Sequence, residues 1–325
     1  MKKIISLLLF VVIAMSCISC TFPTATPEDD GAKMNIGVMS GPTGMGMAKL
    51  MKDNIDSTEK YAFELYSSPQ DAMADLLSRE LDLLCLPTNT AATLYNKNEN
   101  LISVLAINTL GSLYLLSDGN TEIKSVSELN GKTIYTSVAS STTVPILNAI
   151  LEKNGVDATI EVEADHDTLV SRIVKGEVSL AVLPEPKVTA ALVQNPTYSV
   201  DLNLSTEWDK VFENSLTMGC IVVRNEFLKA HEGAVQRFLR EYKESVNYIA
   251  NPENLESAAQ MIFEVGVIPK LPIAKKSLAN LKGSIAYLDG NEMKTSLTEF
   301  YNVLLESMPQ SIGGKLPTDA FYYGA

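Results

Sequence analysis

Short apolar runs alternate with stretches of helical periodicity from Met34 onward, and this alternation limits the possible folds more than any other feature of the sequence. A run such as residues 81–86 is too short for a buried helix and is typical of a strand inside a sheet. Strands separated by single helices form βα units around a largely parallel sheet, so we expect an α/β protein. The elements predicted in its first part are strands at 35–39, 61–66, 81–86, 101–109 and 112–117 and helices at 45–54, 69–80 and 91–97.

The same order of elements begins again about 96 residues later, and residues 86–94 match residues 183–191 at an offset of 97. Two similar offsets favour two structurally alike α/β lobes, and the alternative is convergence of two ordinary βα patterns. Beyond Trp208, a β-rich segment at 216–223 leads into helices that we expect to pack on an existing lobe, without strands between them. The elements predicted in this second part are strands at 132–136, 159–163 and 179–184 and helices at 144–154, 167–175, 225–231, 235–249, 255–265, 273–281 and 293–308.

Composition excludes several classes of protein. The 325 residues suffice for two domains, and a hydrophobic share of 46% is too high for a disordered chain. Lys and Arg total 26 against 39 Asp and Glu, and this net charge of −13 argues against nucleic-acid binding. With two histidines and four cysteines, we predict no metal site, and no arrangement of catalytic residues is visible. Cys85 and Cys220 are expected as isolated buried thiols, His166 and His231 as surface residues, and Trp208 as structural.

The first twenty residues predict export. Lys2 and Lys3 precede an apolar run at 4–15, and small residues follow it, which is the pattern of a secretory signal. Its end resembles a bacterial lipobox, in which the signal is cut before a cysteine that is then acylated; Cys20 is preferred and Cys17 is the alternative. We expect a signal peptide at 1–19, a flexible tether at 20–33 and a protein anchored on the extracytoplasmic face of the cell membrane. The other interpretation is an ordinary secreted protein with chance cysteines.

Ligand-binding loops are expected where strands lead into helices, because ligands of open parallel sheets bind beyond the carboxyl ends of the strands. Four such junctions stand out, two in each half, at residues 40–46, 87–90, 137–143 and 184–186. Their glycines allow a ligand to approach closely, and their hydroxyl and amide groups supply donors and acceptors. The candidate ligand-binding residues are Ser40, Gly41, Thr43, Gly44, Met45, Thr88, Asn89, Ser137, Ser140, Ser141, Thr142 and Glu185, with Tyr114 as a stacking surface.

Each candidate has a structural alternative. The loop at 41–46 is otherwise a strand-to-helix turn, Thr88 and Asn89 otherwise cap the next helix, and Tyr114 is otherwise a core residue. Glu185 is the only charged group within the four loops, and it either meets a cationic or N–H-rich ligand or is a solvated cap. Because these loops hold no Arg or Lys apart from Lys187 just after Glu185, the pattern favours a small organic solute, heterocyclic or zwitterionic, over nitrate.

Four segments, at residues 41–46, 82–96, 183–186 and 313–323, carry a resemblance to a known family. With them the whole chain resembles the substrate-binding lipoproteins of bacterial ABC importers, in the group that includes nitrate, sulfonate, taurine and thiamine-precursor binders. Relatives carry a Gly-rich loop where this chain has the hydroxyl-rich residues 137–142, which leaves the ligand open.

The resemblance implies a two-lobed type II periplasmic-binding fold, in which each lobe is a mixed, mostly parallel sheet flanked by helices. It assigns residues 34–117 and 217–325 to lobe 1 and residues 118–216 to lobe 2. The two lobes are then joined by a two-strand hinge, for which residues 118–120 and 214–218 are the candidates.

The resemblance also implies a function. The protein would be a monomeric, non-enzymatic receptor without cofactor that closes on a small-molecule solute and delivers it to an ABC permease and its ATPase. Two other classes stay open. One is an anchored ligand sensor, and the other is an enzyme on the same fold, similar to proteins of the menaquinone pathway.

Overall fold

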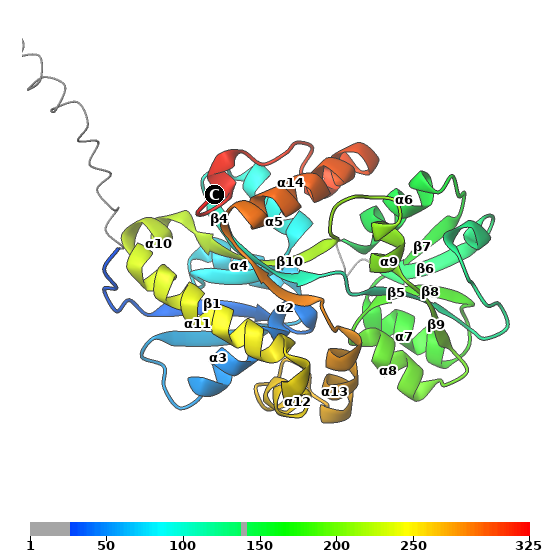
Figure 1. Cartoon of the computed structure of the whole chain (residues 1–325), viewed down its shortest axis with the longest axis horizontal. Helices are drawn as coiled ribbons and strands as arrows, with labels where there is room; N and C mark the ends of the chain where they lie inside the picture. Colours follow the sequence, from blue (N-terminus) through cyan, green and yellow to red (C-terminus); the bar gives the residue numbers. More distant parts are fainter. Residues whose placement is uncertain (1–26, 138–141) are drawn as a thin grey trace, which may run out of the picture.

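The computed structural model describes residues 27–137 and 142–325, which form two α/β lobes side by side (Figure 1). Cys17, Cys20 and the predicted signal peptide lie outside the described residues, as do Ser140 and Ser141 of the predicted ligand loops. Each lobe contains one mixed sheet flanked by helices, which confirms the predicted fold class.

The sheet of lobe 1 has parallel strands at one side and antiparallel strands at the other. β2, β1 and β3 run parallel, whereas β10 is antiparallel to both β3 and β4, and β11 is antiparallel to β4. All eight residues of β10 are buried, as expected for a central strand covered by helices on both faces. The spatial order is β11 (Ile285–Leu288), β4 (Ile102–Leu110), β10 (Thr217–Arg224), β3 (Leu83–Pro87), β1 (Met34–Met39) and β2 (Tyr61–Tyr66).

The sheet of lobe 2 repeats this arrangement, and the repeat confirms the two alike units that the offset of 97 predicted. β7, β6 and β8 are parallel in the order of β2, β1 and β3, and an antiparallel β5 lies beside β8 as β10 lies beside β3. Both β3 and β8 end in a proline, at Pro87 and Pro184. The spatial order is β7 (Thr159–Glu163), β6 (Thr133–Ser137), β8 (Leu180–Pro184), β5 (Leu113–Ser117) and β9 (Ser199–Asn203).

The chain crosses between the lobes earlier than the sequence indicated. β5 pairs with β8 and β9, so this strand belongs to the second sheet and not to lobe 1, where residues 34–117 placed it. The first crossing is therefore at Gly111 and Ser112, and the return crossing precedes Thr217. The first crossing touches the start of β10, because the Ser112 backbone N–H and hydroxyl both lie against the Met218 sulfur, at 3.3 and 3.4 Å. Residues 118–120, expected at the hinge, follow the far end of β5 inside lobe 2.

Helices cover both sheets. The short strand β11 between α13 and α14 corrects the expectation that the C-terminal helices follow one another without a strand. None of the helices in the described ranges is both long and apolar enough to cross a membrane. The helices are α2 (Pro42–Met45), α3 (Ala48–Asp53), α4 (Pro69–Ser78), α5 (Thr88–Lys97), α6 (Thr143–Lys153), α7 (His166–Val174), α8 (Lys187–Gln194), α9 (Leu204–Asp209), α10 (Asn225–Ala230), α11 (Glu232–Ala250), α12 (Leu255–Glu264), α13 (Leu271–Asn280) and α14 (Gly290–Ser307).

The two lobes share a hydrophobic core. Trp208 of α9 is fully buried and packs on Phe300 of α14, with ring centroids 5.6 Å apart, so the structural role predicted for this residue is confirmed. Figure 1 shows α14 lying over the junction and reaching α6 of lobe 2. Cys85 and Cys220 are free buried thiols, as predicted, and burial raises the pKa of Cys85 to about 12.

Candidate ligand-binding site

A hollow of about 660 Å³, part of it open to solvent, lies between the lobes at the carboxyl ends of the parallel strands. Both lobes and both crossing segments contribute to its walls. Its described lining contains hydroxyl, proline and methionine side chains and one imidazole, but no Lys, Arg, Asp or Glu. The lining residues are Met39, Ser40, Pro42, Thr43, Ser67, Pro69, Pro87, Thr109, Ser112, Thr142, His166, Pro184 and Met218.

The loop between β1 and α2 forms one wall. Gly41 has a φ of 102°, a conformation that side chains other than glycine rarely adopt, and it turns the chain so that Ser40 and Thr43 both line the hollow. A Cβ on Gly41 would lie 3.6 Å from Pro186 of lobe 2, so this loop reaches the opposite lobe. Ser40 and Thr43 therefore line the hollow, and as ligand contacts they stay predictions.

His166 and Thr142 form the opposite wall, at the first turn of α7 and the N-cap of α6. The Nδ1 atom of His166 lies 2.5 Å from the Ser137 hydroxyl at the end of β6. Burial, together with the nearby Lys187 ammonium, lowers the pKa of His166 from 6.5 to about 4, so this imidazole is neutral at pH 7. His166 was predicted at the surface; it is instead half-buried and lines the hollow.

Besides the four-residue α2, whose Pro42 also lines the hollow, four helices begin there, two from each lobe. Pro69 opens α4, Pro87 precedes α5, Thr142 caps α6 and His166 opens α7. The free N–H groups and positive dipole end of a helix favour anions and hydrogen-bond acceptors. No charged side chain is among the described lining residues, although the charges of Lys187, Asp165 and Asp167 act on His166 from outside the lining.

Several predicted residues lie outside the hollow. Gly44 and Met45 are buried in the turn of α2, and a Cβ on Gly44 would lie 1.9 Å from the Met39 carbonyl oxygen. The Thr88 hydroxyl donates to the Thr217 carbonyl at 2.8 Å, and Asn89 beside it is buried. The Tyr114 hydroxyl donates to the Asn280 carbonyl at 3.0 Å, on another side of the junction. As ligand contacts, these five residues stay predictions.

Glu185 is buried rather than solvated, and it does not line the hollow. Its carboxylate accepts hydrogen bonds from the Thr189 backbone N–H at 3.2 Å and hydroxyl at 3.0 Å, which caps α8. The Asn280 side-chain amide of lobe 1 donates to the same carboxylate at 2.6 Å. The Glu185 carboxylate thus accepts hydrogen bonds from Thr189 in its own lobe and from Asn280 in the other lobe. These contacts favour a role in joining the lobes over the predicted contact with a cationic ligand.

The sequence interpretation missed Ser67, Thr109, Ser112 and His166. Ser67 follows β2 and His166 opens the helix after β7, so both lie at strand ends of the kind that was used to choose the four loops. Applying the same rule to all six parallel strands would have found them. Thr109 and Ser112 lie at the first crossing between the lobes. No local sequence pattern predicts where that crossing occurs. Among the described residues, no three His, Cys, Asp or Glu side chains gather in a way that would hold a metal ion.

Two lobes that are joined by two crossings and carry the same strand order, around a hollow of strand-end loops, define the type II periplasmic-binding fold. The chain belongs to the NMT1/THI5-like family, whose profile matches residues 63–255. This confirms the family resemblance found in the sequence.

Solved structures share the fold at low identity. An ABC transporter structure from Parabacteroides distasonis is 22% identical, covers 89% of this chain and 98% of that chain, and gives a TM-score of 0.72. The periplasmic aliphatic sulphonate binding protein of Escherichia coli is 16% identical over 89% and 95% of the two chains, with a TM-score of 0.69. The periplasmic nitrate-binding protein of Synechocystis is 11% identical over 88% and 85%, with a TM-score of 0.63. Comparison with curated protein sequences gives no match.

Proposed function

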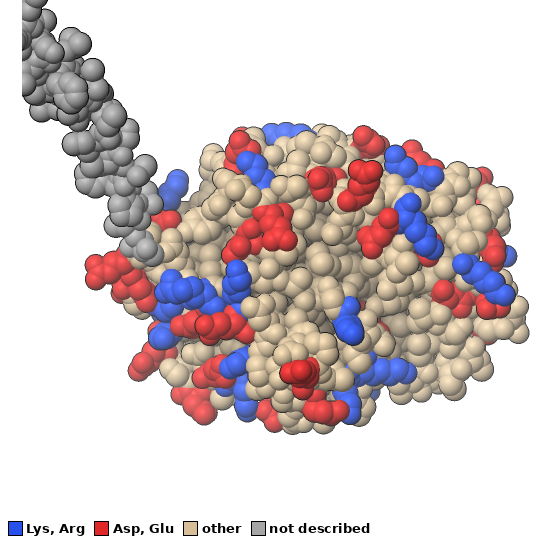
Figure 2. Space-filling view, in the orientation of Figure 1, with Lys and Arg blue, Asp and Glu red and all other residues tan. Residues whose placement is uncertain are grey.

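We propose that the protein is a lipid-anchored, extracytoplasmic solute-binding protein that captures a small organic solute between its lobes and delivers it to the permease and ATPase of an ABC importer. The family membership and the two-lobed fold support this role, and the similar solved structures include binding proteins for sulphonate and nitrate. On the face shown in Figure 2, acidic and basic side chains are interspersed without an extended basic stripe, which does not favour a nucleic-acid partner.

The observation that carries the proposal is the hollow itself. Ser40, Thr43, Thr109 and Thr142 supply short hydroxyl groups, and four helix N-termini supply a positive potential without a charged side chain among the described lining residues. A solute with an uncharged or anionic hydrogen-bond-accepting head group fits this chemistry. A cation would meet no described counter-charge there, because Glu185 faces elsewhere.

A ligand screen tests this function. Thermal unfolding would be followed in the presence of sulfonates, pyrimidines, thiamine precursors, riboflavin and amino acids, and a true ligand should raise the melting temperature by mass action. Thr142→Val removes one lining hydroxyl and should weaken binding of that ligand about tenfold, whereas Thr133→Val at an exposed position of β6 is the matched control. A chain that binds no member of the panel and shows no ligand-dependent closure in small-angle scattering would contradict the proposal.

The anchor is tested separately. Cells that express the full chain would be labelled with radioactive palmitate, and label should be lost on Cys20→Ser, or on Cys17→Ser if the alternative cysteine is used. An unlabelled chain in the membrane-free fraction would show that the protein is not a lipoprotein, without bearing on solute binding.

A further inference from the structure

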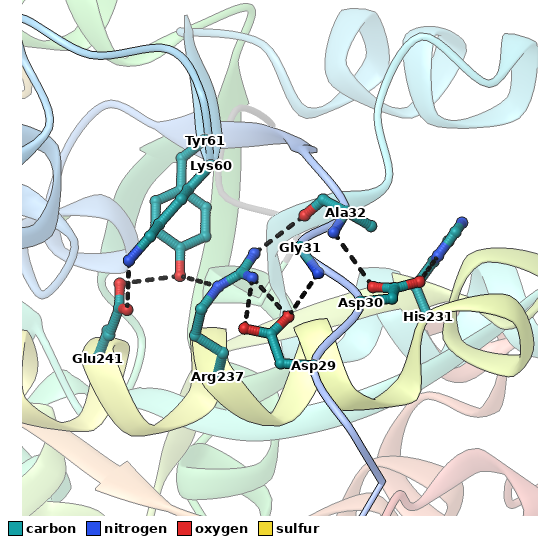
Figure 3. Close-up of polar contacts among 9 residues, drawn as sticks. All are labelled: Asp29, Asp30, Gly31, Ala32, Lys60, Tyr61, His231, Arg237 and Glu241. Atoms are coloured by element: carbon teal, nitrogen blue, oxygen red, sulfur yellow. Dashed lines mark hydrogen bonds and ion pairs between the residues drawn. The ribbon is translucent and has the colours of Figure 1, made fainter.

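Residues 28–32, which we call the strap, lie against the start of α11 instead of extending freely from the fold (Figure 3). The sequence placed these residues in a flexible tether. In Figure 1 the first described residues pass beside α10 and α11, at the end of lobe 1 that is away from lobe 2.

A buried arginine holds the strap. The Nη1 atom of Arg237 donates to both carboxylate oxygens of Asp29, at 2.6 and 2.8 Å, and Nη2 donates to the Ala32 carbonyl at 2.9 Å. The Arg237 side chain is only 7% exposed, and its Nε atom lies 3.3 Å from the Tyr61 hydroxyl. Charge-assisted hydrogen bonds of this kind are short and strong, so they hold Asp29 against Arg237.

Two further contacts show that the surface of α11 is shaped for the strap. The Nδ1 atom of His231 lies 2.6 Å from the Asp30 carboxylate. A Cβ on Gly233 would lie 2.0 Å from the Glu28 carbonyl oxygen, so the strap passes where any larger residue would have its side chain. The Asp29 and Asp30 carboxylates also accept the backbone N–H groups of Gly31 and Ala32, at 3.0 and 3.1 Å, so the strap is ordered by contacts of its own.

We propose that the strap holds the end of lobe 1 formed by α10 and the start of α11 toward the lipid surface, so that lobe 1 alone carries the membrane anchor. The proposal rests on the lipid anchor of the proposed function. Eight peptide units separate Cys20 from Glu28, and at about 3.5 Å per residue they reach at most roughly 28 Å. If the strap were released, the chain from Cys20 to Met34 would reach roughly 50 Å. Docking therefore nearly halves the distance that this end of lobe 1 can move from the bilayer, and it leaves lobe 2 free of the anchor.

Hydrogen exchange tests the docking on the soluble chain. The Gly31 and Ala32 amides should exchange about tenfold more slowly than free amides, because each donates to a carboxylate. Arg237→Gln, which removes the charged partner of Asp29 on α11 but keeps the carboxylate that accepts the Gly31 amide, and Gly233→Val, which blocks the path of the strap without changing charge, should both abolish this protection. Glu28→Ala changes the charge of the same segment and should keep it. Equal exchange in all four chains would overturn the docking.

Energy transfer to lipid tests the orientation. The full acylated chain in phosphatidylcholine vesicles would carry a donor dye at Lys229→Cys on α10 or at Val193→Cys on α8, and the vesicles a headgroup acceptor. The cysteine of the 17 and 20 pair that is not acylated would be serine. Transfer should be stronger from position 229, and Gly233→Val should remove the difference. Equal transfer from both positions of an anchored chain overturns the orientation while leaving the anchor intact, and absence of acylation overturns the anchor and the orientation together.

Discussion

His166 is the residue whose chemistry differs most from what its position in the sequence suggested. It opens α7 with Nδ1 against the Ser137 hydroxyl, and the charged groups around it are Lys187, Asp165 and Asp167. Lys187 is paired with Asp167 at 2.5 Å, and Asp165 accepts the Thr168 N–H as the cap of the helix. Burial outweighs the two carboxylates, so the folded protein keeps this imidazole unprotonated.

Because His166 is kept neutral, we predict that the free energy of unfolding falls in acid. The pKa of His166 is about 4 in the folded protein and 6.5 in the unfolded chain. Between these two pH values the unfolded chain therefore binds a proton that the folded protein does not. Stability should therefore fall as the pH drops from about 7 to about 4, by on the order of 3 kcal/mol from this residue. Urea unfolding should show a smaller fall for His166→Gln than for the natural chain. His231→Gln removes the other histidine and is the control; an identical fall in the His166→Gln and natural chains would show that His166 titrates normally.

At the scale of elements, the short helix α2 positions one wall of the hollow because its glycine removes a steric obstacle. Gly44 lets the turn fold back on β1, where a Cβ would lie 1.9 Å from the Met39 carbonyl oxygen. The same turn presents Ser40 and Thr43 to the hollow.

Gly44→Ala should destabilise the fold by about 3 kcal/mol, since a backbone oxygen has little room to move. Gly155→Ala is the matched control: it has a φ of +63° with nothing within 4 Å, and should cost about 1 kcal/mol. Both values come from denaturant unfolding. Equal losses would mean that the turn of α2 shifts to accept a methyl group, and that it does not fix the wall.

Most elements could be predicted from the sequence because burial leaves a strong periodic pattern. The predicted ranges 61–66 and 159–163 coincide with β2 and β7, and the buried strands β3 and β8 were found with their terminal prolines. β9 and β11 were missed, because five residues with alternating polar groups and four residues at a sheet edge carry little signal. The sheet to which β5 belongs depends on pairing with β8 and β9, which lie far along the chain, and no local pattern contains that information.

At the scale of the whole molecule, a polar contact joins the lobes beside the hollow. Asn280 at the end of α13 donates to the buried Glu185 carboxylate of lobe 2 at 2.6 Å, and its carbonyl accepts the Tyr114 hydroxyl at 3.0 Å. This contact must break if the lobes separate along this side, so it favours the closed arrangement.

Asn280→Ala should shift the ligand-free protein toward an open form, with a larger radius of gyration in small-angle scattering. The loss of one charge-assisted hydrogen bond should also weaken solute binding about tenfold, because less of the protein is in the binding-competent state. Asn195→Ala makes the same chemical change inside lobe 2, where the amide donates to the Ile173 carbonyl at 3.0 Å, and should leave the scattering unchanged. An unaltered radius for Asn280→Ala would show that the shared core around Trp208, and not this contact, holds the lobes together.

The late return of the chain to lobe 1 as β10 has a consequence for the timing of folding. β10 separates β3 from β4 in the first sheet, yet Thr217 at its start follows its hydrogen-bond partner Thr88 by 129 residues. Contacts of such sequence separation form slowly. A chain that ends after Ser215 is thus expected to be digested by a protease that spares the full chain. Until Arg224 has emerged, the first sheet lacks a central strand, whereas the five strands of the second sheet all lie between Leu113 and Asn203 and can pair before it. Lobe 2 is therefore expected to fold before lobe 1.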